Sequence, residues 1–212
     1  MKELVLILAV ASAVLCGCST NSSPAASGDK EVKAASGYDS DYAANPQIPD
    51  DRMLLTKGDA FSDEKGEVTL IESETPGVIK ELGPVRLTIQ DTKLIHLMPD
   101  YSMIDYFHVL THEEEFDFVK FFVEIENTSK EKVNFAPIAL IETNTGERLD
   151  WEKDIYLEEL NGEIRGGESK KGNLGYILEK TEDLEWVELT TSDVFDKNHK
   201  KIQDSKKIRI EL

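Results

Sequence analysis

Alternation between apolar and polar side chains constrains this chain more than any other feature, and it is strongest in residues 116–126. One side of that stretch is apolar throughout and comprises Val119, Phe121, Val123 and Ile125. The other side is mixed and comprises Phe118, Lys120, Phe122, Glu124 and Glu126. A period of two places alternate side chains on opposite faces of a β-strand. We therefore expect a strand that is buried on one face and partly covered on the other.

Shorter runs that indicate strands recur between residues 85 and 212, and several of them also alternate. They cover residues 85–89, 133–135, 138–141, 172–178, 186–189 and 207–212. Turn-forming sequences such as Asn161-Gly162 separate them. No run has the period of a long amphipathic helix, although residues 100–112 have room for one or two helical turns. Short strands, close turns and no helical crossovers predict an all-β, antiparallel β-sandwich, with a small closed barrel as the alternative.

Aromatic residues and charge bound the domain and its partners. Thirteen of the 16 aromatic residues lie in residues 84–212, and the composition changes from about Gly66 onward. We expect one domain over residues 66–212, with its core in 84–212. The formal net charge is −18, from 42 acidic and 24 basic residues. This acidity excludes a general electrostatic grip on nucleic acid and argues against adsorption of the folded surface to anionic lipid.

The first 17 residues have the form of a signal peptide. An apolar run from Leu4 to Leu15, too short to span a bilayer, follows a short charged start. The run ends in Leu15-Cys16-Gly17-Cys18, which resembles a bacterial lipobox, with an apolar residue at −3 and a small residue at −1. The resemblance implies cleavage after Gly17 and attachment of a lipid with palmitate-type acyl chains to Cys18. Cys16 suits that role poorly, because Leu15 before it is bulky. An ordinary secretory peptide is the alternative.

Residues 18–65 are predicted to form a flexible, acidic and polar tether behind the lipidated cysteine. The stretch is rich in Ser, Ala, Gly, Asp and Lys, and its sparse apolar residues follow no period. Such a segment cannot bury enough apolar surface to offset its ordering entropy. Residues 48–55 have room for a short helical turn.

Three later segments carry a resemblance to a known family. They are Phe118–Val133, with the strand, Asn-Thr and turn in sequence, Thr143–Glu147, and Gly166–Tyr176. Together they resemble telokin-like, immunoglobulin-fold domains of bacterial lipoproteins, over residues 84–212. The resemblance implies an immunoglobulin-like sandwich, and it transfers no catalytic or cofactor-binding residue to this chain.

The segment His108–Glu115 is the one cluster with the composition of a metal or solute site. On a helix, His108 and His112 would share a face and could meet one zinc ion, with Glu113, Glu114 or Glu115 as a further ligand. On a strand or loop the same spacing separates them, and the segment is then a solvated loop. Further acidic groups lie at 158–159 and 182–185, where solvated carboxylates are the simpler interpretation.

Aromatic residues offer two other hypotheses. A set comprising Trp151, Tyr156, Trp186 and Phe195 could line a ligand patch, although core packing is the simpler role for such residues. A second set, in the irregular stretch 100–112, comprises Tyr101, Tyr106 and Phe107 and is our candidate for an exposed recognition loop.

These features predict a membrane-anchored, extracytoplasmic lipoprotein that acts as a non-enzymatic binding module in a bacterial cell envelope. Its expected partners are the membrane, through Cys18, and another envelope protein, with no nucleic acid and no cofactor. The alternative is a lipoprotein that captures a solute or metal at His108–Glu115. A hydrolase would need a buried carboxylate pair or an oriented Ser–His contact in a cleft.

Overall fold

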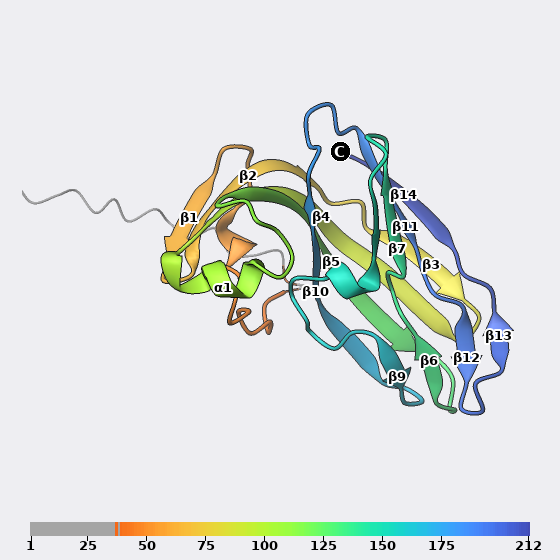
Figure 1. The fold of residues 1–212 in the computed structure, drawn as a ribbon. Helices are drawn as coiled ribbons and strands as arrows, with labels where there is room; N and C mark the ends of the chain where they lie inside the picture. The colour runs from red at the N-terminus through yellow and green to blue at the C-terminus, as the bar shows by residue number, and fades with distance from the viewer. Residues whose placement is uncertain (1–36, 38) are drawn as a thin grey trace, which may run out of the picture. The chain divides into compact units, whose positions relative to one another are not determined.

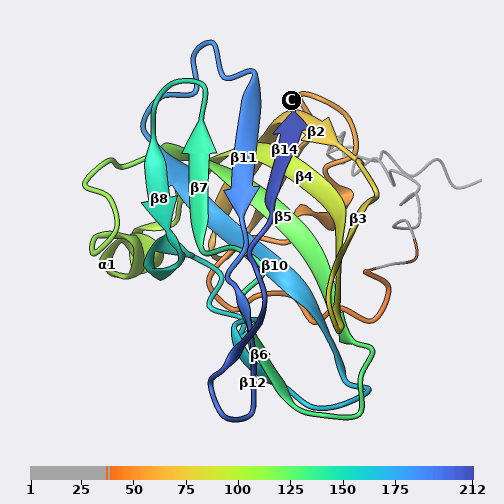
Figure 2. The same ribbon diagram turned by 90° about the vertical axis from the view of Figure 1, so that its right-hand side faces the viewer.

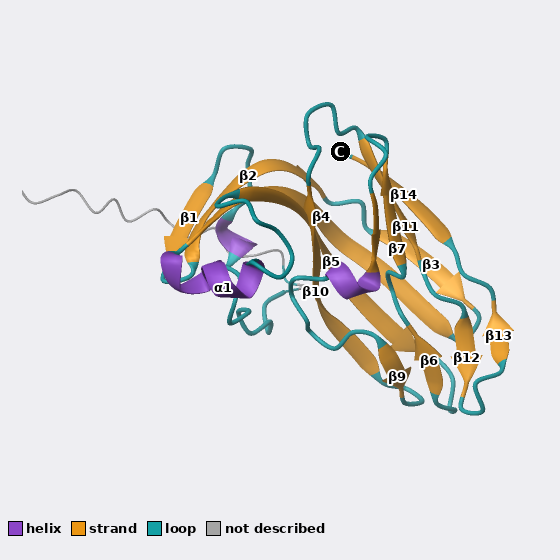
Figure 3. Cartoon of the chain, in the orientation of Figure 1, coloured by secondary structure: helices purple, strands orange, loops and turns teal. Residues whose placement is uncertain are grey.

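The structure, a computed structural model, describes residue 37 and residues 39–212, so the predicted signal peptide and Cys18 lie outside the described residues. Figure 3 shows that strands dominate this part of the chain and that its helical segments are short. All strand pairs among the described residues are antiparallel. The prediction of an all-β, antiparallel fold is confirmed.

The largest sheet has six strands in the order β1-β2-β4-β5-β10, with β3 paired to β4 beside β2. These strands are β1 (Ala60–Asp63), β2 (Gly66–Glu74), β3 (Val78–Leu82), β4 (Val85–Pro99), β5 (Phe116–Asn127) and β10 (Ser169–Leu178). The strand expected at 116–126 is therefore β5. The strand expected at 85–89 runs on to Pro99, and β4 and β5 form the long centre of the sheet.

Two four-stranded sheets complete the architecture. The first, in the order β14-β11-β7-β8, consists of β14 (Lys207–Glu211), β11 (Trp186–Thr190), β7 (Leu140–Thr143) and β8 (Arg148–Asp150). The second, in the order β13-β12-β6-β9, consists of β13 (Lys201–Gln203), β12 (Val194–Asp196), β6 (Val133–Phe135) and β9 (Gly162–Ile164). The helical segments are η1 (Asp51–Met53), η2 (Tyr101–Met103), α1 (Ile104–Phe107) and η3 (Trp151–Lys153). The helical turns expected within 48–55 and 100–112 are present.

The main core lies between the large sheet and the two smaller ones (Figures 1 and 2). The side chains that β5 sends into it are Val119, Phe121, Val123 and Ile125, the apolar side of the predicted strand. The smaller sheets contribute Ile141 and Leu189, among others. The domain is thus a two-layer β structure with one shared core. Its more specific assignment to the immunoglobulin-like, telokin-like class stays a prediction.

A β-bulge in β4 divides this strand between two cores. Before the bulge, which lies between Ile89 and Asp91, the odd-numbered Leu87 and Ile89 face the main core. One inserted residue shifts the alternation of a strand. After the bulge, the even-numbered Leu94 faces the main core, and Ile95 faces the opposite side of the sheet.

The opposite side of the sheet is covered by a second core, and here the predicted tether is wrong in part. Phe118 lies in this core together with Ile48 and Leu54, which the sequence had placed in the tether. Residues 60–63 also form β1 and pair with β2. The folded part of the chain therefore begins before residue 66 and includes residues 39–65.

Residues 39–55, which we call the strap, are held on the large sheet by polar contacts in addition to the buried Ile48 and Leu54. Oδ2 of Asp51 accepts hydrogen bonds from Nζ of Lys93 at 2.8 Å and of Lys120 at 2.7 Å. Nζ of Lys120 also lies 3.2 Å from Oδ1 of Asp91. Burial alone would raise the pKa of Asp51, but the two ammonium groups outweigh it and lower that pKa. This packing could not be predicted from the sequence, because the strap carries few apolar residues.

The segment that follows η3 protects the free edge of β10. Oδ1 of Asp154 accepts a hydrogen bond from the Gly175 N–H at 2.9 Å, and Oε2 of Glu158 accepts one from the Asn173 N–H at 2.8 Å. A Cβ at Gly175 would lie 2.7 Å from the ring of Tyr156, so only glycine allows this close approach. Side-chain acceptors thus replace a neighbouring strand at this edge.

Candidate ligand groove

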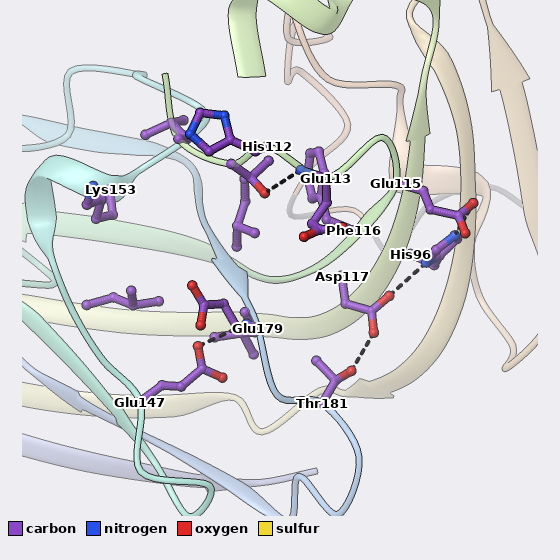
Figure 4. A pocket seen from close by; sticks show the side chains of 15 residues that line it. His96, His112, Glu113, Glu115, Phe116, Asp117, Glu147, Lys153, Glu179 and Thr181 are labelled. Carbon is purple, nitrogen blue, oxygen red and sulfur yellow. Dashed lines mark hydrogen bonds and ion pairs between the residues drawn. The ribbon is translucent and has the colours of Figure 1, made fainter. Parts of the chain in front are cut away.

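A groove of about 790 Å³ opens at one end of the large sheet (Figure 4). One wall is the loop before β5, a second is formed by the β7–β8 turn, β8 and η3, and a third follows β10. The lining residues are His96, Leu110, Thr111, His112, Glu113, Glu115, Phe116, Asp117, Glu147, Leu149, Lys153, Ile177, Leu178, Glu179 and Thr181. Its volume lies in the range of ligand pockets.

Strand register fixes the polar part of the floor. His96 of β4 and Asp117 of β5 are directly paired residues, so their side chains share a face. Nδ1 of His96 lies 2.8 Å from Oδ1 of Asp117, and the hydroxyl of Thr181 donates to the other oxygen of that carboxylate. Figure 4 shows the three side chains in line along one side of the groove. Asp117 is thereby held in one orientation.

Glu147 ties two walls together. Its two carboxylate oxygens accept hydrogen bonds from the backbone N–H groups of Glu179 and Lys180, each at 2.9 Å. The turn before β8 is thereby joined to the segment that follows β10. This carboxylate serves the structure of the groove.

Three of the remaining charged groups at the rim are free, whereas Glu115 lies 3.7 Å from Nε2 of His96. The side chains of Glu113, Glu179 and Lys153 are exposed and make no hydrogen bond or ion pair within residues 37 and 39–212. Buried apolar side chains lie beneath them, including Phe116 and Leu178. The groove thus offers an apolar floor with unpaired charges at its rim, which is chemistry suited to binding.

The predicted segment His108–Glu115 contributes only in part. His112, Glu113 and Glu115 line the groove, whereas His108 lines a smaller neighbouring hollow. The rings of His108 and His112 are in contact, 4.7 Å apart between centroids, although α1 ends at Phe107 and His108 caps it. In the part of the chain that the structure describes, no three His, Cys, Asp or Glu side chains are grouped as metal ligands. The geometry therefore supports a solute groove better than a metal centre.

The candidate aromatic sets do not form one surface. Tyr156 is buried in the second core, whereas Trp151 is 52% exposed. Trp186 stacks under the guanidinium of Arg209, 3.8 Å from the ring centroid. In the predicted recognition loop, Tyr101 is 89% exposed, but Phe107 belongs to the second core.

Most groove residues escaped the sequence analysis because they come from separate segments. His96, Asp117, Glu147 and Glu179 are polar residues in or beside four different strands. The burial of Lys120, by contrast, could have been predicted from the sequence. Lys120 lies between Phe118 and Phe122 on one face of β5, and a lysine flanked by two large aromatic residues is placed where solvent is excluded.

Comparison with known proteins finds a relative along the whole chain. The Bacillus subtilis (strain 168) protein called uncharacterized protein YdhF is 52% identical over 237 aligned positions, which cover 100% of both chains. The SPbeta prophage-derived uncharacterized lipoprotein YonS of the same strain is 25% identical and covers 73% of this chain. A functionally unknown protein from Listeria monocytogenes EGD-e, solved by crystallography, covers 69% of this chain at 13% identity, with a TM-score of 0.49. No protein-family model matches the chain.

Proposed function

The chain belongs to the family of the Bacillus subtilis protein YdhF, and from this premise we propose that it is a lipid-anchored, extracytoplasmic binding module of a bacterial cell envelope. In this role it holds a partner in the groove and catalyses no reaction. The observation that carries the proposal is Leu15-Cys16-Gly17-Cys18 at the end of a signal-length apolar run.

No helix among the described residues is long and apolar enough to cross a membrane. The anchor is supported by the comparisons, because the more distant relative YonS is named a lipoprotein. A lipid on Cys18 would supply the attachment, because two acyl chains bind a bilayer firmly where one chain binds marginally.

The binding role is supported by the groove. Its floor is apolar, and its hydrogen-bonded residues, such as Asp117 and Glu147, are already fixed in place. A preformed site of this kind binds without a large ordering cost. The immunoglobulin-like, telokin-like assignment belongs to the same proposal, and its support is the Asn127–Val133 turn, which joins β5 to β6.

The anchor is tested by separating membranes from soluble material in cells that express single cysteine variants. We expect Cys18→Ser to move the protein to the soluble or secreted fraction, because no acyl group can be attached to serine at this position. Cys16→Ser is the matched control and should stay with the membranes, since residue 16 leaves with the signal peptide. Retention of the Cys18→Ser protein at the membrane would refute the anchor.

A further inference from the structure

The charges at the groove do not balance. Five carboxylates line it, against one ammonium group. Asp117 and Glu147 are engaged in hydrogen bonds, and Glu115 lies 3.7 Å from Nε2 of His96. Glu113 and Glu179 have no such partner within the described residues, and Figure 4 shows them on different walls. Two unpaired negative charges therefore border the groove.

The floor between these charges is apolar. It is formed by Leu110, Phe116, Leu149, Ile177 and Leu178. Lysine and arginine side chains can lay their aliphatic stems on such a surface while the charged head stays in water. The combination of floor and rim complements an aliphatic cation.

We propose that the groove binds a basic peptide segment of an exported partner protein, in which lysine or arginine residues alternate with aliphatic ones. This ligand class rests on the binding role proposed above. The head groups pair with Glu113 and Glu179, and the stems and aliphatic residues lie on Phe116 and its neighbours.

The strength of exposed ion pairs favours a peptide over a small amine. One such pair changes affinity by about fivefold at most, so two pairs supply about twenty-fivefold at most. Even millimolar binding requires about a thousandfold relative to the 1 M standard state. A free amine that meets only Glu113 and Glu179 falls short, whereas a peptide adds apolar contact with the floor and further basic groups.

The charge of the whole chain supports the same ligand. With a net charge of −18, the protein attracts basic partners over a distance and repels acidic ones. Lys153 is the one basic side chain apart from histidine at the groove, and it makes no ion pair within the described part of the chain. Its positive charge therefore repels a basic ligand, and its substitution provides a second test of the proposal.

The test is fluorescence polarisation with the full chain, purified from membranes in mild detergent. The probe is a labelled peptide of alternating lysine and leucine, and a peptide of alternating glutamate and leucine is its counterpart. At low salt, where exposed charges are least screened, we expect saturable binding of the basic peptide and none of the acidic one. Binding of the basic peptide should weaken as salt is added.

Two pairs of variants locate the site. Glu113→Gln combined with Glu179→Gln should weaken binding by about tenfold or more, through the loss of two ion pairs. Glu67→Gln combined with Glu74→Gln makes the same charge change on exposed residues of β2, outside the groove, and should change affinity by less than about twofold.

Lys153→Gln should strengthen binding of the basic peptide by about twofold to fivefold, because it removes a repulsive charge. A gain of affinity cannot come from damage to the fold. Lys200→Gln is its control, since Lys200 is exposed near β13, away from the groove, and should leave affinity unchanged.

Three outcomes would overturn the ligand class. They are equal binding of both peptides, no loss in the Glu113/Glu179 variant, and competition by spermidine at the concentration of the peptide itself, which would indicate a site for small cations. None of these outcomes tests the lipid anchor at Cys18. If Cys18→Ser releases the protein while no basic peptide binds, the anchored state stands and the ligand class is wrong. If Cys18→Ser stays in the membrane, the proposed function fails whatever the peptides show.

Discussion

At the level of single residues, Asp154 is a carboxyl group that the fold buries in order to bind backbone donors. It accepts hydrogen bonds from the N–H groups of Gly175 at 2.9 Å, Tyr156 at 3.1 Å and Leu157 at 3.2 Å. Burial raises its pKa to about 6, and these hydrogen bonds only partly offset the rise. Asp154 therefore supports the edge of β10, and its contribution to the free energy of unfolding depends on pH.

The direction of this pH dependence follows from proton linkage. Between the ordinary pKa of 3.8 and about 6, the folded state holds a proton at Asp154 that the unfolded state has lost. The contribution of Asp154 to the free energy of unfolding is therefore greatest below pH 4 and falls as the pH rises through 6, by about 3 kcal/mol. Asp154→Asn removes this titration.

Urea unfolding of the parent protein and of the Asp154→Asn variant from pH 4 to pH 7 tests this pH dependence. We expect the parent protein to lose stability relative to Asp154→Asn as the pH rises, and carbon NMR of the carboxyl groups should show a titration near 6 that the variant lacks. A difference in stability that stays constant across this range would contradict the prediction.

At the level of elements, the docking of the strap includes a buried ion pair between Asp51 and Lys93. Removal of a partner from a buried ion pair costs about 3–5 kcal/mol, because a charge is left without compensation. We expect Asp51→Ala to lose about this much stability, since buried Lys93 loses its carboxylate partner, whereas Lys120 keeps Asp91. Amide hydrogen exchange should show faster exchange in residues 39–55 first.

The strap contains its own control. Asp41 forms an exposed ion pair with Lys171, at the other end of the same segment. Exposed pairs contribute little, so Asp41→Ala should leave the exchange pattern nearly unchanged. If the two variants behaved alike, the buried charges would not be what holds the strap.

The strands could be predicted where one face of the pattern is apolar, as in Val119 to Ile125 of β5. The strap could not, because Ile48 and Leu54 are isolated in the sequence and another of its contacts is made by a charged residue, Asp51. The role of Asp51 cannot be predicted from the sequence, because it depends on the pairing of β4 with β5, which brings Lys93 and Lys120 side by side. Polar docking of this kind is a property of the tertiary structure.

The groove shows the same limit. The sequence indicates Glu113 and Glu115 as candidate site residues because they lie beside two histidines, and both line the groove. Glu179, on the facing wall, and Asp117, on the floor, are far away in sequence. Adjacency in the chain reveals a cluster on one loop, whereas a site assembled from several strands requires the register.

For the whole molecule, the important fact is that two cores share the same strands. Phe118 of β5 is fully buried in the second core, and Phe121, three residues on, is fully buried in the main core on the other face. The large sheet is thus the common wall of both cores. Because neither core can lose β5 without exposing the other, we expect the domain to unfold as one cooperative unit.

Alanine at each phenylalanine tests this expectation. Each substitution should cost about 3–5 kcal/mol and lower the same urea transition, because both leave a cavity against the shared sheet. Far-ultraviolet circular dichroism, which follows all strands, and fluorescence of Trp186, which lies in the layer beyond the main core and is recorded in a Trp151→Phe background, should report coincident midpoints in both variants. If Phe118→Ala instead released the strap and α1 at low urea while the Trp186 signal kept the midpoint of the parent protein, the second core would be a separate folding unit. The groove, which takes Leu149 from β8 on one side of the main core and Phe116 from the second core, would then be able to open without unfolding the sandwich.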